Sequence, residues 1–114
     1  MSEKNTTNER LQHILEASEM IFSYTQNLYK EEFLKDPQVI DAVIRRFEII
    51  GEAARTLPKN IRDLEKEINW SEWIGFRNLL IHQYPDVKKH IVWQTIKSEL
   101  SDFQKKITSL KNKL

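Results

Sequence analysis

Residues 77–84 gather side chains that can bind a phosphate group and move a proton. Within an apolar segment the stretch carries Arg77, Asn78, His82 and Tyr84. The guanidinium of Arg77 presents a planar fork of donors that matches phosphate oxygens. An imidazole, such as that of His82, can accept or donate a proton. These residue types together suit cleavage of a phosphodiester bond.

Cleavage of RNA by its own 2′-hydroxyl requires a base, an acid and positive charge beside the phosphorane. His82 is the candidate base or acid, since a positioned acid or base contributes about 10²–10⁴ in rate. Arg77 is the candidate for stabilising the charge on the phosphorane. Asn78 can orient the imidazole or the substrate, and Tyr84 can hydrogen-bond a phosphate or stack on a base. We therefore expect Arg77 and His82 to be catalytic, with no metal ion and no cofactor.

The spacing of these residues divides them between two faces of a helix. At about 100° per residue, Arg77 and Tyr84 point the same way. Asn78 and His82 lie four residues apart and share another face. Arg77 and His82 of one straight helix therefore do not converge easily on one phosphate. Two helices related by a two-fold axis achieve that convergence, so the geometry predicts a homodimer with its active-site cleft at the interface.

Plainer structural roles are open for the same residues. His82 can cap a helix, Arg77 can pair with Glu48 or Glu52, and Tyr84 can belong to an ordinary helix end. Glu48 and Glu52 are four residues apart and repel each other unless paired. Each has an arginine three residues further out, which favours a surface ion network. The alternative for both glutamates is a supporting role, in which they orient Arg77 or His82.

The chain as a whole bounds the classes of function. Its 114 residues form a single domain over 1–114, with residues 1–6 and 112–114 expected to be flexible. A net charge of +1 gives no global attraction to nucleic acid, so RNA binding requires a local site. The absence of cysteine excludes disulfides, thiolate metal sites and cysteine nucleophiles. Neither a signal peptide nor a membrane span is indicated, so a cytoplasmic location is expected.

The spacing of apolar residues predicts an all-α fold. Only two glycines and three prolines occur, and apolar residues recur at helical spacing. We expect an up-down four-helix bundle with a short extra connecting helix. The predicted helices cover residues 7–29, 37–57, a short connection over 59–69, a third helix from Ser71 to near Pro85, and a fourth after Asp86.

Two local signals sharpen this prediction. Asp36-Pro37 places a capping carboxylate before a proline at the first helical position. This pair marks the start of the second predicted helix. Gly51 lies within that helix, where it weakens helix propensity by about 1 kcal/mol relative to alanine. Such a glycine indicates close approach by another backbone.

The last helix carries an apolar seam at alternating steps of three and four residues, beginning at Trp93.

The motif resembles that of the HepT family of ribonuclease toxins, of the wider HEPN class. The family carries Arg-Asn, three residues, His, one residue and Tyr, which here are Arg77, Asn78, His82 and Tyr84. Residues 47–54, 68–70 and 91–93 are similar to other family segments, and the likeness spans about residues 10–110. Gln83 departs from the pattern, since many members have glycine there; its bulk bears on access to the groove.

The resemblance implies a homodimeric, metal-independent endoribonuclease that acts as a toxin on tRNA or mRNA. It also implies a partner, a small nucleotidyltransferase antitoxin of the MntA type that transfers AMP to Tyr84. Each AMP adds negative charge and bulk where RNA phosphate has to bind. Two alternatives stay open at this point. One is a non-catalytic helical subunit that binds nucleotide or presents substrate to a nucleotidyltransferase, and the other is a purely structural dimeric bundle.

Overall fold

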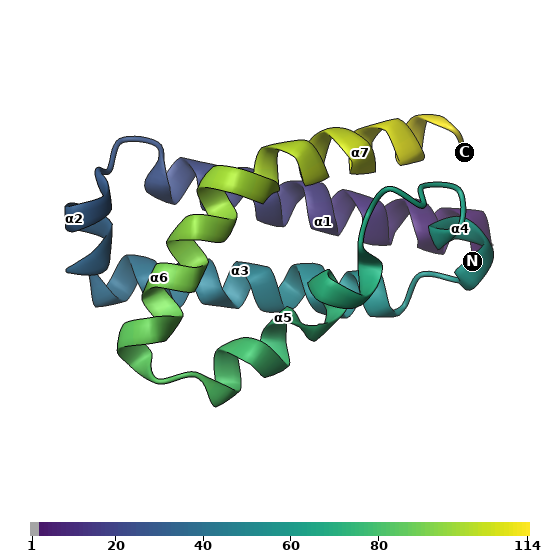
Figure 1. The fold of residues 1–114 in the computed structure, drawn as a ribbon. Helices are drawn as coiled ribbons and strands as arrows, with labels where there is room; N and C mark the ends of the chain where they lie inside the picture. The colour runs from purple at the N-terminus through teal and green to yellow at the C-terminus, as the bar shows by residue number, and fades with distance from the viewer. Residues whose placement is uncertain (1–2) are drawn as a thin grey trace.

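The computed structural model describes residues 3–114, with side chains described from residue 5. This part of the chain is helical and contains no strand, so the predicted all-α class is confirmed (Figure 1). The helices are α1 (Glu3–Thr25), α2 (Lys30–Leu34), α3 (Pro37–Arg55), α4 (Lys59–Arg62), α5 (Trp70–His82), α6 (Pro85–Thr95), the π-helical turn η1 (Ile96–Leu100) and α7 (Ser101–Asn112). The sequence predicts that residues 1–6 are flexible. Of these, residues 1 and 2 lie outside the described residues.

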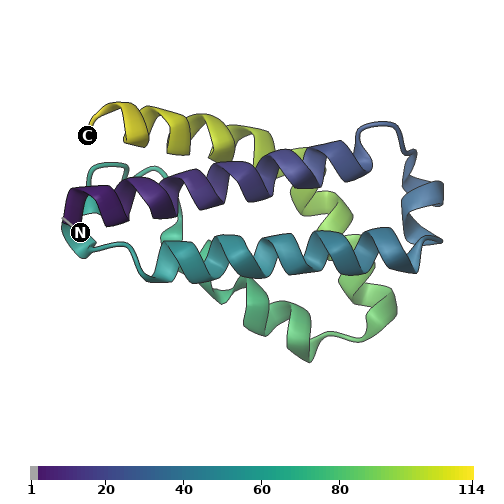
Figure 2. The same cartoon turned by 180° about the vertical axis from the view of Figure 1, so that it is seen from behind.

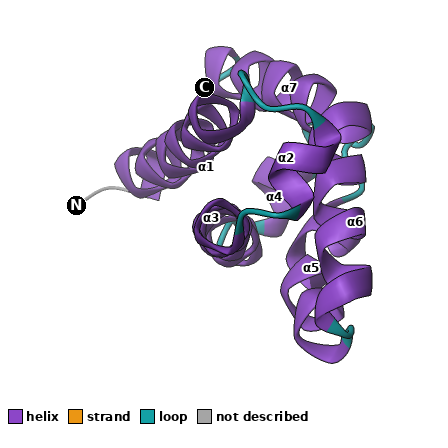
Figure 3. Ribbon diagram, turned by 90° about the vertical axis from the view of Figure 1, so that its left-hand side faces the viewer, coloured by secondary structure: helices purple, strands orange, loops and turns teal. Residues whose placement is uncertain are grey.

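Two long helices, α1 and α3, form the base on which the other elements pack. They run in opposite directions and lie side by side (Figures 1 and 2). α7 lies along α1, and α5 packs against α3. α6 crosses α3 steeply in both of these views, and Figure 3 shows α5 and α6 together on one side of α3. The stretch that contains the motif therefore lies at one edge of the molecule, between α5 and α6.

The apolar seam predicted for the last helix is buried. Six of its seven predicted positions are Trp93, Ile96, Leu100, Phe103, Ile107 and Leu110, each no more than 9% exposed, whereas the seventh, Leu114, is half-buried against the core. Full burial of such a side chain contributes about 1.5–3 kcal/mol. Trp73 of α5 stacks on Phe103 with ring centroids 4.0 Å apart. Trp70 and Trp93 therefore belong to the core, and Trp73 is half-buried against it.

The start of α3 follows the sequence prediction. Oδ1 of Asp36 accepts a hydrogen bond from the backbone N–H of Val39 at 3.2 Å, and Pro37 occupies the first helical position. The helix ends at Arg55, three residues before Pro58. Local chemistry alone thus sets the start of the helix that carries Glu48 and Glu52.

Several other boundaries differ from the prediction. The first helix ends at Thr25 rather than near residue 29, and the short helix α2 was not expected. The connecting helix covers only Lys59–Arg62, and the fourth helix begins at Pro85. The predicted cap Ser71 is wrong, because α5 begins at Trp70 and Oδ1 of Asn69 accepts from the backbone N–H of Glu72 at 3.3 Å.

Gly51 lies where the backbone of α5 comes close to α3, as predicted. A Cβ atom at this position would lie 3.0 Å from the backbone oxygen of Trp73 and 3.6 Å from that of Ile74. Real Cβ atoms essentially never come closer than this. The absence of a side chain at Gly51 therefore sets the distance between α3 and the helix that carries the motif.

Candidate active site

The motif residues lie at the end of α5 and at the turn that follows it. Arg77 and Asn78 are on α5, His82 is its last residue, and Tyr84 precedes the first turn of α6. Gln83 between them has extended backbone, with φ −89° and ψ 149°. The expectation that Arg77 and Tyr84 share a helix face is therefore wrong, because the helix ends before Tyr84.

Arg77 is paired with a glutamate of α3. Its Nε lies 3.5 Å from Oε2 of Glu48. The side chain of Arg77 is 55% exposed and that of Glu48 is 30% exposed, so the guanidinium is anchored on one side and open to solvent on the other. Such a partly exposed pair is worth at most about 1 kcal/mol. Its main consequence is that it orients the guanidinium.

Glu52 belongs to a different pair. Its Oε1 accepts a hydrogen bond from Nη2 of Arg55 at 2.5 Å on the exposed surface of α3. The hydrogen bond and the positive charge of Arg55 lower the pKa of Glu52, and the charge of Arg77 lowers it further by a smaller amount. The two glutamates of α3 therefore have different partners. Glu48 contacts the motif directly, whereas Glu52 acts on Arg77 only through its charge.

The remaining motif side chains are open to solvent. Asn78, His82 and Tyr84 are exposed, and Tyr84 is 81% exposed. Across residues 3–114, the structure records no hydrogen bond or ion pair for these three side chains, so none joins His82 to Arg77. One protomer therefore presents the chemical groups without closing a site around a phosphate.

Large apolar side chains of the same segment are also exposed at the surface. The exposed members are Leu79 (41%), Ile81 (55%), Tyr84 (81%) and Val87 (44%), and we call them the motif patch. Only Leu80 of this segment is buried among core residues, at 2% exposure. The sequence reasoning missed the patch, although the run Leu79-Leu80-Ile81 indicated it: three consecutive residues of a helix cannot all face one core.

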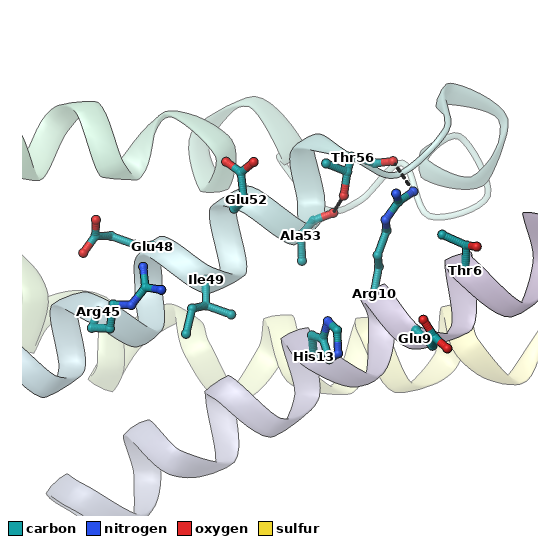
Figure 4. Close-up of a pocket in the computed structure, with 10 residues that line it drawn as sticks. All are labelled: Thr6, Glu9, Arg10, His13, Arg45, Glu48, Ile49, Glu52, Ala53 and Thr56. Atoms are coloured by element: carbon teal, nitrogen blue, oxygen red, sulfur yellow. Dashed lines mark hydrogen bonds between the residues drawn. The ribbon is translucent and has the colours of Figure 1, made fainter.

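A second surface feature, a groove of about 380 Å³, lies between α1 and α3. Figure 4 shows Arg10 and His13 on α1, and Arg45 and Glu48 on α3, among the residues that line it. Arg10 is already used, since its Nη1 donates to the backbone oxygen of Thr56 at 2.9 Å. Carboxylates and cationic side chains are about equally frequent along the groove, so its charge does not favour a phosphate chain.

Residues 3–114 hold no cluster of three or more His, Cys, Asp or Glu side chains able to bind a metal ion together. None of the helices described in this range is long and apolar enough to cross a membrane. His13 and His90 are exposed.

Comparison with known proteins identifies the family. The model of the HepT-like ribonuclease family matches residues 14–110. A protein of Caldanaerobacter subterraneus subsp. tengcongensis, named as a candidate RNase, is 37% identical over 90% of this chain and 92% of its own length. A Thermococcus cleftensis protein, named as that organism's candidate ribonuclease HepT, is 36% identical over 95% of this chain and 98% of its own. No solved structure matches the chain.

These matches define the class of protein as an RNA-cleaving enzyme. The chain belongs to the HepT-like ribonuclease family. The resemblance stated from the motif is thereby confirmed at the level of the family, and the matched residues include all four motif positions.

Proposed function

We propose that the chain is a metal-independent endoribonuclease toxin in which Arg77 and His82 are the catalytic pair. The observation that carries this proposal is the arrangement at the end of α5. Arg77 is anchored by Glu48, while His82 and Tyr84 stand free at the same surface. Membership of the HepT-like ribonuclease family supports RNA as the substrate.

In the proposed reaction the 2′-oxygen attacks the adjacent phosphorus atom. His82 removes the proton of the 2′-hydroxyl, and Arg77 donates hydrogen bonds to the phosphorane oxygens. The bond from phosphorus to the 5′-oxygen breaks, and that oxygen takes a proton from an acid. The products are a 2′,3′-cyclic phosphate and a 5′-hydroxyl. A second imidazole, His82 of another copy, is suited to supply that proton.

The proposal therefore includes a homodimer with the active-site cleft at its interface, built from up-down four-helix bundles. Two observations support it. The motif side chains of one copy make no contact that joins Arg77 to His82. The motif patch also leaves four large apolar side chains exposed beside them, and burial of such a surface against a second copy is favourable.

Regulation is proposed to act at Tyr84. A nucleotidyltransferase antitoxin of the MntA type would transfer AMP from ATP to the tyrosine hydroxyl, with pyrophosphate as the leaving group. Tyr84 is 81% exposed, so its hydroxyl is accessible to a second enzyme. The phosphate of the adduct would repel the phosphates of RNA. The proposed substrate is tRNA or mRNA, and the proposed location is the cytoplasm.

The deciding experiment assays purified protein against a panel of RNAs, with and without EDTA. We expect cleavage by the wild type in EDTA and none by His82→Ala or Arg77→Ala, with folding checked by circular dichroism. Cleavage by His82→Ala at the wild-type rate would refute the assignment. Growth arrest on expression, relieved by the nucleotidyltransferase, tests the toxin role. Intact mass of the co-expressed protein, compared with Tyr84→Phe, tests the modification.

A further inference from the structure

Beside Tyr84 lies a groove that the proposed reaction does not use. It has a volume of about 490 Å³ and lies where α2, the start of α3 and the start of α6 meet (Figure 1). Ligand sites in proteins typically have volumes of about 300–1,000 Å³. Pro85, the residue after Tyr84, is one of its walls. One wall of the groove is therefore formed by the residue that directly follows the motif in the chain.

The walls of this groove suit a flat apolar ring. Leu34, Ile40 and Ile44 line it together with Pro37 and Pro85. Leu34, Ile40 and Ile44 are half-buried and pack on the core, so they form a fixed surface. Tyr84, which is exposed and precedes Pro85 in the chain, can stack on a second base. Proteins recognise RNA sequence chiefly in single strands, whose bases can be splayed out onto such surfaces.

The polar groups at the rim suit a nucleotide. Lys88 lines the groove, and across residues 3–114 no carboxylate pairs with it; its ammonium group is therefore free to bind a phosphate. Lys89 is already used, since its Nζ donates to the backbone oxygen of Leu34 at 3.2 Å and lies 3.4 Å from Oδ1 of Asp86. Asp41 is exposed, and the structure records no partner for it in the described residues.

We propose that this groove binds an unpaired base of the RNA strand next to the scissile phosphate, and that it selects bases with an exocyclic amino group. This inference rests on the proposed function. The carboxylate of Asp41 only accepts hydrogen bonds, so it binds the N4 amino group of cytosine. Uracil has the same size but presents a carbonyl oxygen at that position, which the carboxylate repels. The groove therefore favours cytosine over uracil.

The test measures the affinity of short 2′-O-methyl oligocytidine and oligouridine by fluorescence anisotropy. These strands cannot be cleaved, because the attacking 2′-oxygen is blocked. A hydrogen bond to a charged group is worth about tenfold in affinity, so we expect the wild type to prefer oligocytidine by about this factor. Asp41→Asn should bring the ratio close to one, since an amide donates as well as accepts.

Two further variants complete the test. Ile40→Thr should weaken binding of both strands several-fold, with folding checked by circular dichroism. Glu99→Gln removes an exposed carboxylate elsewhere in the chain and should behave as the wild type. Unchanged affinities and an unchanged ratio in Asp41→Asn and Ile40→Thr would overturn the proposal. Weakened self-association of Ile40→Thr in ultracentrifugation, without any effect on the strands, would assign the groove to a second copy instead and also overturn it.

The inference and the proposed function can fail separately. If RNA is cleaved in a His82-dependent manner but base preference does not depend on Asp41, only the base site is wrong. If no RNA is cleaved but oligocytidine binds in an Asp41-dependent manner, the nuclease assignment is wrong and the base site stands. A wild type that neither cleaves nor binds these strands overturns both.

Discussion

Oε2 of Glu48 lies 3.5 Å from Nε of Arg77, and this ion pair links α3 to the motif on α5. A guanidinium fork has several donors, so the pair leaves the terminal nitrogens available to a phosphate. The position of Glu48 thus fixes the direction in which Arg77 presents its charge. We therefore propose that Glu48 is a positioning residue for Arg77.

Glu48→Gln should reduce kcat/KM for RNA cleavage about two- to fivefold, since a partly exposed ion pair is worth up to about 1 kcal/mol. The loss should appear in kcat more than in KM, because the direction of the donors matters most in the transition state. Steady-state kinetics on a labelled RNA measures both. Glu52→Gln is the matched control, since Glu52 pairs with Arg55 instead. Equal losses in the two variants would contradict the positioning role.

Gly51→Ala should destabilise the protein by up to about 2 kcal/mol. Alanine gains about 1 kcal/mol of helix propensity, but its Cβ would meet the backbone oxygen of Trp73 at 3.0 Å. A carbonyl held in a helix cannot move aside without shifting α5, and such overpacking costs about 1–3 kcal/mol. Urea unfolding followed by circular dichroism measures the change. Cleavage should fall as well, because the motif helix shifts.

Gly75→Ala is the matched control for this crossing. A Cβ at Gly75 meets nothing within 4 Å, and the residue lies within α5. The substitution should therefore stabilise the protein by up to about 1 kcal/mol. If both alanine variants were stabilised alike, the close approach at Gly51 would have no energetic consequence.

Asn69→Ala should cost about 1 kcal/mol of stability, since it removes the side chain that accepts from the N–H of Glu72 at 3.3 Å. Ser71→Ala should cost less. Its hydroxyl only donates to Oδ1 of Asn69 at 2.9 Å and satisfies no free N–H of the helix. Thermal unfolding of the two variants compares them directly. A larger loss in Ser71→Ala would restore Ser71 as the more important residue at this helix start.

These helix starts show what local sequence can predict. At Asp36-Pro37 the capping carboxylate and the proline indicate the same boundary, and α3 begins there. Before α5, Asn69 and Ser71 are both good capping residues, two positions apart, and local preference does not choose between them. Burial of Trp70, at 9% exposure, is a tertiary effect consistent with the earlier start.

The composition of the candidate site was predictable from the sequence, but its geometry was not. Residue types and spacing select Arg77 and His82 as candidates, and the structure leaves both exposed on α5; their catalytic role stays a prediction. The pairing of Arg77 with Glu48 depends on how α5 crosses α3. The position of Tyr84 depends on the extended backbone of Gln83, which a straight helical projection does not include.

Acid should weaken the fold through Glu52. Arg55 lowers the pKa of Glu52 in the folded state, below the ordinary value of about 4.3. The stabilising contribution is therefore complete above that ordinary value and is lost as pH falls through the lower, folded-state pKa. We expect Glu52→Gln and Arg55→Gln each to flatten the acid limb of stability against pH. Urea unfolding at a series of acidic pH values measures this limb.

The double variant separates the pair from other carboxylates. Because both substitutions remove the same interaction, their effects on the acid limb should not add. Additive effects, or single variants that run parallel to the wild type, would show that Arg55 does not stabilise the charge of Glu52.

Ile81→Asp should abolish self-association and leave the monomer folded. Ile81 is 55% exposed at the centre of the motif segment, so the carboxylate costs little in an isolated chain but would have to be desolvated between two copies. Ultracentrifugation measures the association, and circular dichroism the fold. Cleavage should be lost together with the dimer, since one copy does not bring Arg77 and His82 into contact.

Leu64→Asp provides the matched control for this interface. Leu64 is a similarly exposed apolar residue at 46%, but it lies between α4 and α5, away from the motif patch. It should leave both association and cleavage as in the wild type. If Ile81→Asp became monomeric and still cleaved RNA at the wild-type rate, each copy would hold a complete site. A single chain would then have to bind the phosphate with its own Arg77 and His82, although these two side chains lie on different faces of α5.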